Sequence, residues 1–442
     1  QEPLVTGTNG QIFLSGLDLS EAEYAISEVP YGKYVLDSVE IRTGNQSAEN
    51  AQEIVSSGRD GNGYALYPLE VTAGNTYHVD VYNARPSDLT IIKEWADADG
   101  ASGMKAHVRI TNTDTNVVEY EDVEITDRVT VNLQPGNYLI EEIKVEDGKG
   151  NYVLNTDDTR TRTTVNIPEK TTCTLTNERI SAGLKLTKTA EADNLENLWW
   201  EEADVSYTIT PEETNSLPLT SYVLSDTGLT MKAEDTEGHE QEIGFDSADY
   251  NTYIRQKYAI TSVSLSKVSH NVTYLKDAQI GGEIAIVRGY DFDDQLVKEV
   301  TVDVSQDAAP GQLTVSFDRS SMVKRFTVTY EDTVLKNSKI NAGKEDGQSY
   351  VLGRDFKAGQ IQVGLHLFLQ DAKDAAGQDL KSVTEVTNHA EAVLNYLKPD
   401  GEGKVTGEPI VEKSEDDVQI PVNDPDVAVV TVNKTVDPEK AN

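Results

Sequence analysis

Short stretches in which apolar and polar residues alternate occur along nearly the whole chain, and this pattern most constrains the fold. A β-strand turns successive side chains to opposite faces, so each stretch predicts a strand with one buried face. Gly, Asn, Asp and Pro separate the stretches, as turns require. Long amphipathic helices are hard to find, and the best short candidates are 21–29 and 251–260. The sequence therefore predicts an all-β chain, a string of antiparallel sandwiches.

Repeated strand endings suggest how the chain is divided. A strand that ends in Asn is followed, after a few polar residues, by a strand that ends in Lys, in NARPSDLTIIKEW and again in TNERISAGLKLTKT. We therefore expect domains over 1–86, 87–179 and 180–422. Residues 423–442 are expected to be a linker and the first strand of a following domain. The segment 256–345 is too long for a loop of a plain sandwich, so we expect it to form an inserted β subdomain.

Composition excludes several classes of partner. With 76 Asp and Glu against 38 Lys and Arg, the formal net charge is -38, and Coulomb repulsion disfavours nucleic acid and anionic membrane surfaces. The single cysteine, Cys173, excludes an intrachain disulfide, and its place on a core face indicates a small buried apolar residue. No stretch has the length and apolarity of a membrane span. The N-terminus shows no signal peptide, which fits a mature secreted fragment as well as a cytoplasmic protein.

The sequence gives no indication of a cofactor or a metal. The six histidines are scattered singly, without an H-E-x-x-H spacing, and there is no glycine-rich phosphate loop. Acidic clusters at 97–100, 291–294 and 414–417 offer oxygen atoms of the kind that calcium prefers. They lack the spacing of a full calcium loop, so a solvated surface is the favoured interpretation. We expect no cofactor and no metal site.

A lysine, an acid and an asparagine share the inward face in residues 87–179. Lys93 alternates with apolar residues in LTIIKEW, Glu142 lies on the core face of PGNYLIEE, and Asn177 lies on the core face of CTLTNER. Glu141, on the opposite face, is the alternative acid if a β-bulge shifts the register.

The same three residue types recur in residues 180–422. Lys188 stands in the first strand, LKLTKTAEA, Asp226 follows apolar residues in SYVLSD, and Asn388 lies among Val and Ala in EVTNHAEA. Two independent sets of this kind indicate a shared chemistry.

These residues lie in motifs that resemble known families. Residues 87–179 resemble the Cna-B type domain of Gram-positive surface proteins and pilins, because IIKEWADADG is similar to its opening strand, PGNYLIEE to its Gly-x-Tyr-x-x-x-Glu signature and TCTLTN to its closing strand. Residues 180 to about 422 resemble the larger fimbrial isopeptide-forming domain through LTKTAEA, VSYTIT, LSDTG and VTNHAEA. NGQIFLSGL and PYGKYVL in the first domain are similar to the Cna-B type. The resemblance implies tandem immunoglobulin-like or prealbumin-like sandwiches.

The resemblance also implies a spontaneous intramolecular amide bond in each of the two later domains. The roles, in the order lysine, asparagine and catalytic acid, fall on Lys93, Asn177 and Glu142, and on Lys188, Asn388 and Asp226. Residue chemistry agrees, since burial lowers the pKa of a lysine and makes a neutral, nucleophilic amine available. A buried acid is expected to stay protonated and to pass a proton to the leaving ammonia. A lysine that reaches water, an asparagine that caps a turn and a plain buried ion pair remain alternatives.

The first domain departs from this pattern. Tyr34 of its signature is followed by Ser38 at the position of the acid, and the strand that should supply a lysine is not in the chain. Asn83, expected to face inward with Val79 and Val81, is either an unpaired remnant or needs residues upstream of Gln1. We predict no crosslink within 1–86, and the chain has the pattern of an excerpt from a longer array.

Three functions are open at this point. The first is a self-crosslinked, non-enzymatic stalk or pilus-like segment on the surface of a Gram-positive cell, whose partners are further domains of the same polypeptide. The second is an adhesin module whose 256–345 region binds a host or glycan ligand through aromatic residues such as Tyr274, Tyr290 and Phe292. The third is a set of accessory domains of a secreted carbohydrate-active enzyme.

Overall fold

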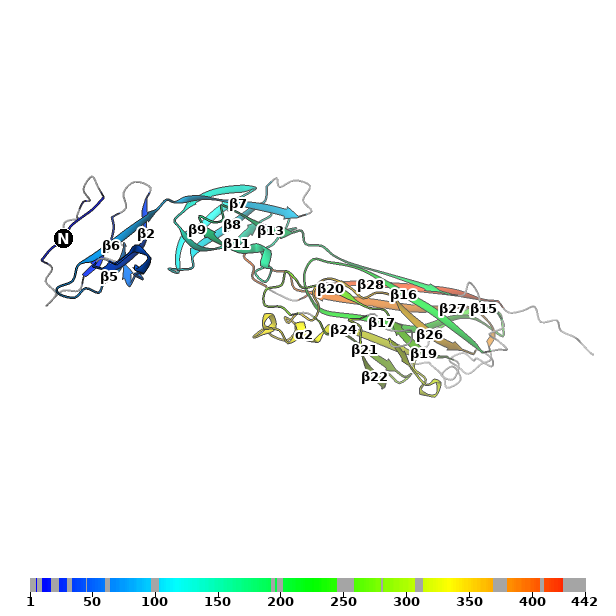
Figure 1. The fold of residues 1–442 in the computed structure, drawn as a ribbon. Coiled ribbons are helices and arrows are strands. Elements are labelled where there is room, and N and C mark those ends of the chain that lie inside the picture. The colour runs from blue at the N-terminus through cyan, green and yellow to red at the C-terminus, as the bar shows by residue number, and fades with distance from the viewer. Residues whose placement is uncertain are drawn as a thin grey trace, which may run out of the picture. The chain divides into compact units, whose positions relative to one another are not determined.

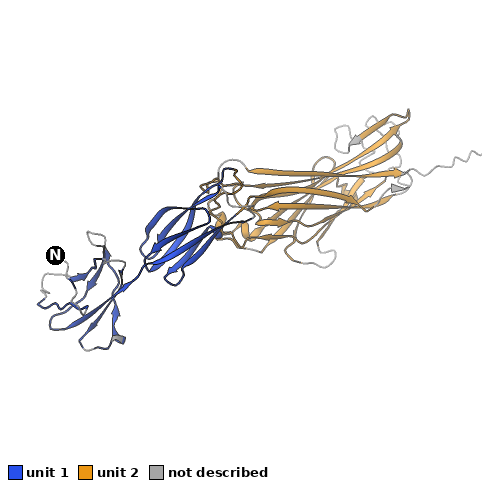
Figure 2. Ribbon diagram, turned by 90° about the horizontal axis from the view of Figure 1, so that it is seen from above, with its two compact units in different colours: residues 1–148, 160–177 blue, residues 149–159, 178–442 orange. Residues whose placement is uncertain are grey.

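The computed structural model describes residues 5, 10–16, 24–29, 34–44, 46–59, 64–96, 103–191, 195–196, 202–244, 258–279, 281–306, 313–368, 380–405 and 409–423. Regular structure in these ranges is almost entirely β (Figure 1), which confirms the predicted fold class. The chain divides into two compact units, residues 1–148 with 160–177 and residues 149–159 with 178–442 (Figure 2). No helix in the described ranges has the length and apolarity to cross a bilayer.

The first part of unit 1 forms two small sheets. Their orders are β1-β5-β4 and β3-β2-β6. The strands are β1 (Tyr24–Ile26), β2 (Val35–Thr43), β3 (Gln52–Glu53), β4 (Gly58–Arg59), β5 (Ala65–Leu69) and β6 (Tyr77–Ala84), with a 3-10 turn at Ala48–Asn50. The predicted helix over 21–29 is wrong for its described part, because β1 pairs antiparallel with β5 there.

The rest of unit 1 is a β-sandwich. One sheet has the order β10-β7-β13 and the other β12-β11-β8-β9. The strands are β7 (Ser87–Ala96), β8 (Lys105–Asn112), β9 (Val117–Ile125), β10 (Arg128–Leu133), β11 (Gly136–Glu146), β12 (Arg162–Ile167) and β13 (Thr172–Glu178). Leu89, Ile91 and Leu175 of the first sheet and Ile110 and Tyr138 of the second join one buried cluster, since apolar residues alternate along each strand.

Unit 2 is built around two larger sheets. Their orders are β14-β16-β26-β19-β23 and β15-β28-β27-β17-β24-β21-β22, with β18 paired to β17, and a short pair β20-β25 adds to them. The strands are β14 (Ala182–Ala190), β15 (Leu195–Glu196), β16 (Ala203–Asn215), β17 (Leu219–Asp235), β18 (Glu240–Gly244), β19 (Tyr258–Leu265), β20 (Ser269–Asn271), β21 (Glu283–Tyr290), β22 (Leu296–Asp303), β23 (Thr314–Ser316), β24 (Arg325–Asp332), β25 (Arg354–Lys357), β26 (Ile361–Leu367), β27 (Leu380–Tyr396) and β28 (Ile410–Asn423). A short helix, α2 (Thr333–Lys336), follows β24.

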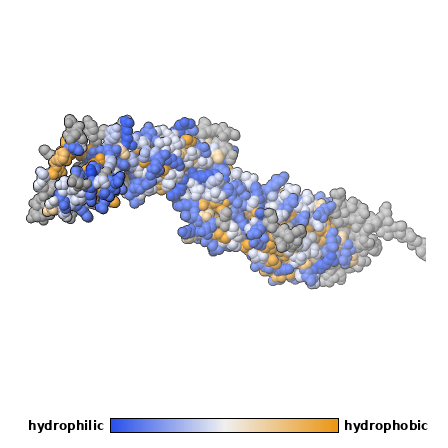
Figure 3. Space-filling model, in the orientation of Figure 1, coloured by the Kyte–Doolittle hydropathy of each residue, from blue (hydrophilic) through white to orange (hydrophobic). Residues whose placement is uncertain are grey.

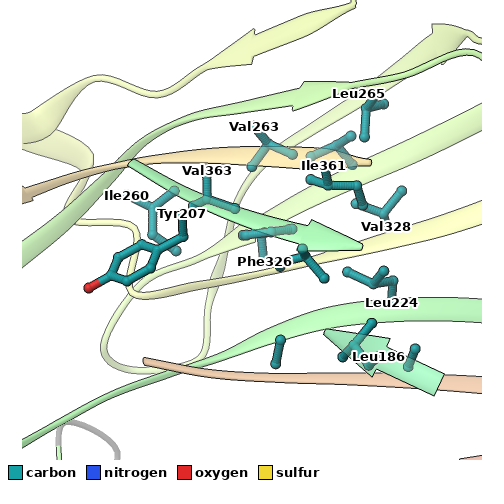
Figure 4. Close-up of a cluster of buried hydrophobic side chains, with 14 of the residues drawn as sticks. Leu186, Tyr207, Leu224, Ile260, Val263, Leu265, Phe326, Val328, Ile361 and Val363 are labelled. Atoms are coloured by element: carbon teal, nitrogen blue, oxygen red, sulfur yellow. The ribbon is translucent and has the colours of Figure 1, made fainter. Parts of the chain in front are cut away.

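The core of unit 2 lies between its two large sheets. Ile260 and Val363 come from strands of one sheet, and Leu224 and Phe326 come from the other (Figure 4). Hydrophilic residues cover much of the molecular face seen in Figure 3, as expected for strands that alternate between core and solvent.

The segment 256–345 differs from its prediction as an inserted subdomain. Its strand β19 pairs with β26 in one large sheet, and its strand β24 pairs with β17 in the other. Amphipathic strands of this kind carry no sign in the sequence of which neighbour they pair with. Residues 258–260 lie in β19, so the end of the predicted helix over 251–260 is a strand, and 251–257 fall outside the described residues.

Strand positions can be compared with the predicted domain boundaries. Strand β7 begins at Ser87 and β14 at Ala182, close to the boundaries predicted near 87 and 180. The segment 149–159, between β11 and β12, is grouped with unit 2. The domain boundaries themselves remain a prediction, and the strand expected around 430–434 lies outside the described residues.

Candidate functional site

Lys93 is buried in unit 1, as the alternation along β7 predicts. Its side chain is fully shielded from solvent, and Nζ lies 4.2 Å from the centre of the Trp95 ring. Nζ donates hydrogen bonds to the backbone oxygens of Glu94, at 2.7 Å, and Leu175, at 3.3 Å. Because Leu175 belongs to β13, the amine reaches the strand that carries Asn177.

Glu142 approaches the same amine from the facing sheet. Its Oε1 lies 3.4 Å from Lys93 Nζ, and neither side chain is exposed. Asn177 on β13 is also buried, with 3% of its surface exposed. The register of β11 against β8 shifts only after Glu142, so the bulge does not exchange the faces of the two glutamates. Glu141 faces outward and receives a 2.9 Å hydrogen bond from Arg109, so the alternative acid is not at the site.

The buried environment shifts Lys93 toward its neutral form. Desolvation by burial lowers its pKa, and the negative charge of Glu142 only partly opposes this effect. A lower pKa increases the fraction of unprotonated amine at neutral pH. Burial therefore makes Lys93 a better nucleophile than a solvent-exposed lysine at the same pH.

Lys188 is the counterpart in unit 2. Its side chain on β14 is fully buried, and Nζ donates a 3.0 Å hydrogen bond to Asp226 Oδ2. Nζ also lies 5.4 Å from the centre of the Tyr207 ring. Burial lowers the pKa of Lys188, with Asp226 again opposing the shift.

Asp226 connects the amine to Asn388. Asn388 Nδ2 donates to Asp226 Oδ1 at 3.3 Å and to the backbone oxygen of Gly228 at 3.0 Å. Both side chains come from adjacent strands, β17 and β27, whose register shifts between Asp226 and Gly228. The shift brings the Gly228 N–H to 3.2 Å from Asp226 Oδ1, which fixes the carboxylate beside the amide.

The two sites use different strands for the same grouping. In unit 1 the lysine and the asparagine lie on neighbouring strands of one sheet, and the acid comes from the other sheet. In unit 2 the lysine strand belongs to one sheet, and the acid and asparagine strands belong to the other. Strand β28 follows β27 and pairs along it, so Asn388 is not on the final strand of the sandwich. The second site brings a buried amine, carboxyl group and amide into contact through Asp226. In the first site the amine and the carboxyl group are in contact, and the amide is buried on the strand that the amine reaches. Such a grouping is what amide exchange requires.

Some residues of the second site were not predicted from the sequence. Tyr207 faces Lys188, and its inward position could have been found from the alternation in VSYTIT. Asp416 Oδ2 accepts a 2.6 Å hydrogen bond from the backbone N–H of Lys188, and Ser414 Oγ accepts one from that of Leu186. These contacts hold β14, the strand of Lys188, against β28. No local pattern in the sequence predicts them.

The acidic clusters mostly make contacts within the protein. Asp291 caps a turn by accepting from the backbone of Asp293 and Gln295, and Asp294 pairs with Arg325 at 2.9 Å. Residues 414–417 contact β14, as described above, and His389. Residues 97–100 lie outside the described ranges.

Two further predictions can be compared with the structure. Cys173 is buried in the core of its sandwich, as predicted. Asn83 is exposed, not inward, and donates a 3.0 Å hydrogen bond to Glu28 Oε1. The prediction for Asn83 is wrong because burial does not alternate at this end of β6, where Val81, Tyr82 and Asn83 are all exposed.

The aromatic residues proposed as a ligand surface are only half-exposed. The Arg354 guanidinium lies 5.3 Å from the Tyr274 ring centre and that of Arg325 lies 4.0 Å from the Tyr290 ring centre. Phe292 packs edge-on against Tyr258. The two guanidinium groups cover one ring face each of Tyr274 and Tyr290, faces that a glycan would need.

Comparisons with known proteins give limited information. No protein-family model and no curated protein sequence matches the chain. Solved structures with some likeness include BcpA, the major pilin subunit of Bacillus cereus, at 11% identity over 76% of this chain and 69% of that chain, TM-score 0.22. AvmM, which catalyses macrocyclization in alchivemycin A biosynthesis, is 7% identical in sequence over 57% of this chain and 95% of that chain, with a TM-score of 0.20. The major pilin SpaA of Corynebacterium diphtheriae is 9% identical in sequence over 74% of this chain and 68% of that chain, with a TM-score of 0.18. Likenesses this weak carry no argument, so the proposals below depend on the geometry of the two sites.

Proposed function

We propose that this chain is a structural, stalk-like segment of a Gram-positive cell-surface protein, in which two β-sandwiches crosslink themselves through Lys–Asn amide bonds. The observation that carries the proposal is the second site, where Asp226 contacts Lys188 Nζ at 3.0 Å and Asn388 Nδ2 at 3.3 Å in a buried setting. The first site repeats the residue types, with Lys93 and Glu142 in contact. An acidic chain without an intrachain disulfide suits the exterior of such a cell, where covalent stability must come from another bond.

The proposed reaction conserves atoms and electrons. Unprotonated Lys188 Nζ attacks Cγ of Asn388, the Nζ–Cγ bond forms, and the Cγ–Nδ2 bond breaks to release ammonia. The carboxyl group of Asp226 takes the proton that Nζ loses and supplies one to the departing nitrogen, so the acid is unchanged at the end. Lys93, Asn177 and Glu142 would react in the same way.

Folding supplies the drive for this reaction. Groups held at contact distance in a fixed geometry react as if present at effective concentrations of about 10⁵ M or more. Each site reacts once, because the reaction consumes its own side chains. The chain is therefore proposed to be a substrate of its own maturation and not an enzyme with turnover.

The intact mass of the denatured protein tests the proposal. The wild-type chain should be lighter than its sequence mass by two ammonia molecules, and Lys93→Ala and Lys188→Ala should each restore one. Peptide mapping should find the branched peptides that join 93 to 177 and 188 to 388. If aged, folded protein still has the full mass calculated from its sequence, neither crosslink has formed and the proposal is wrong for both sandwiches.

A further inference from the structure

A buried cluster of one imidazole and two carboxylates lies in unit 2, away from the lysine sites. His270 stands on β20, Glu283 begins β21, and Asp332 ends β24. One potential ligand atom from each of the three lies within 4.8 Å of the others. The side chain of His270 is 1% exposed, that of Asp332 0% and that of Glu283 16%.

The sheet itself brings the two carboxylates together. Glu283 and Asp332 are direct partners in the antiparallel register of β21 and β24, strands that lie side by side next to α2 in Figure 1. His270 comes from a different, two-stranded sheet, β20-β25. The cluster therefore connects separate elements of the fold.

Backbone groups fix one oxygen of each carboxylate and leave the other directed at the imidazole. Asp332 Oδ1 accepts from the N–H groups of Val334 and Leu335 at the start of α2, and Glu283 Oε2 accepts from Gly282 N at 3.1 Å. The opposite oxygens, Asp332 Oδ2 and Glu283 Oε1, lie 3.2 and 3.7 Å from His270 Nε2. Outer contacts of this kind orient ligands in metal sites.

Gly282 is needed for this arrangement. Its φ of +144° lies in a region that other residues rarely adopt, and a Cβ would come within 2.6 Å of Thr333 Oγ1. A side chain here would displace the N–H that holds Glu283.

The atoms that converge are left without ordinary hydrogen bonds. Among the described residues, neither ring nitrogen of His270 makes one, and neither does Asp332 Oδ2. Burying such groups, one of them a carboxylate oxygen, is costly unless a partner of positive charge satisfies them.

We propose that His270, Glu283 and Asp332 bind one divalent transition-metal ion, with zinc as the representative. Bonds of about 2.0–2.2 Å to nitrogen and oxygen place tetrahedral ligands about 3.3–3.5 Å apart, and the two distances to His270 Nε2, 3.2 and 3.7 Å, bracket that value. A nitrogen ligand with two carboxylates suits zinc, whereas calcium prefers six to eight oxygens. One tetrahedral position is left for water, and the partial exposure of Glu283 gives the ion a way in. This site is independent of the proposed crosslinks.

Zinc binding by the full chain tests the site. The protein is stripped with EDTA, transferred into buffer with millimolar magnesium to occupy surface carboxylates, and titrated with zinc against a fluorescent chelator. One equivalent should bind, and His270→Gln and Glu283→Gln should each weaken it by more than about tenfold. The matched control is His366→Gln, because His366 also lies beside two carboxylates, those of Asp204 and Glu202, but these are exposed. Its zinc affinity should match wild type.

A second measurement keeps the proposal open to refutation if a variant folds poorly. Wild-type protein loaded with Co²⁺ should show the intense visible absorption of a four-coordinate nitrogen and oxygen site, and zinc should displace it. Uptake of less than one equivalent, an equal loss in His366→Gln, or a six-coordinate cobalt spectrum would each overturn the assignment. In those cases the cluster is a histidine held between two carboxylates as an ion pair.

Discussion

Replacing Asp226 with Asn should stop the second crosslink while keeping the shape of the side chain. The variant lacks the carboxyl group that contacts both Lys188 Nζ and Asn388 Nδ2, so the proton transfer has no carrier. Its denatured mass should therefore exceed that of wild type by one ammonia molecule, after correction for the substitution itself. The first crosslink, which lies in the other unit, should be unaffected.

The cost in stability follows from the loop that the bond closes. Residues 188 and 388 enclose 200 residues (388 minus 188). If the chain-entropy relation for disulfides applies to this bond, losing it lowers the free energy of unfolding by about 5 kcal/mol. For a domain of this size, that corresponds to a fall in Tm of roughly 10–20 °C.

Denaturant unfolding and calorimetry, each paired with intact mass, measure this effect. Lys188→Met is the second variant, because it removes the bond by a different route and leaves no buried amine. Both variants should share the loss of about 5 kcal/mol, beyond any difference in local packing. The reasoning fails if either variant lacks the bond by mass and yet unfolds within about 1 kcal/mol of crosslinked wild type.

Three further outcomes are expected. Glu142→Gln should abolish the first crosslink, as measured by intact mass, whereas Glu141→Gln should retain it. Glu141→Gln should lower the free energy of unfolding by no more than about 1 kcal/mol, because it loses only a surface ion pair. Equal effects of the two variants on the crosslink would contradict the assignment of the acid. Cys173, whose pKa burial raises to about 11, should resist a thiol reagent at pH 8 until the protein is denatured, and fast native labelling would show that its site is open. In Asn177→Ala, which cannot crosslink, burial lowers the pKa of Lys93 in the folded state, so the unfolded chain binds more protons at this residue and the contribution of Lys93 to the free energy of unfolding should rise as the pH increases toward 10.5. That rise, measured by denaturant titration, should disappear when Lys93 is also replaced by Met.

The burial of the two lysine sites could be predicted from the sequence because face parity in a strand is a local property. Lys93 follows Leu89 and Ile91 at intervals of two, and all three are buried as that spacing requires. The same rule placed Glu142 on the core face of its strand and Glu141 on the opposite face. It failed for Asn83, because burial stops alternating at the end of β6, where three consecutive residues, 81–83, are all exposed.

Pairing between distant segments could not be predicted in this way. The strands of 256–345 join both large sheets of unit 2, and nothing in their own residues distinguishes this from a separate subdomain. His270, Glu283 and Asp332 are similarly scattered, and each is unremarkable in its own stretch of sequence. Their convergence depends on the register of β21 with β24 and on the position of β20, which only the fold supplies.

The place of β28 beyond Asn388 has a mechanical consequence for the proposed crosslink. With Lys188 bonded to Asn388, tension from the N-terminal side crosses the sandwich through covalent bonds only as far as β27. It must then pass to β28 through the hydrogen-bonded ladder between them, in which Asn388 faces Val418. Residues 389–396 stay paired with β17, so rupture of that ladder would free the 27 residues from 397 to 423 (423 minus 396), an extension of about 9 nm at roughly 3.4 Å per residue. Single-molecule pulling should thus record one short, reversible lengthening step from this domain while its remaining strands stay folded.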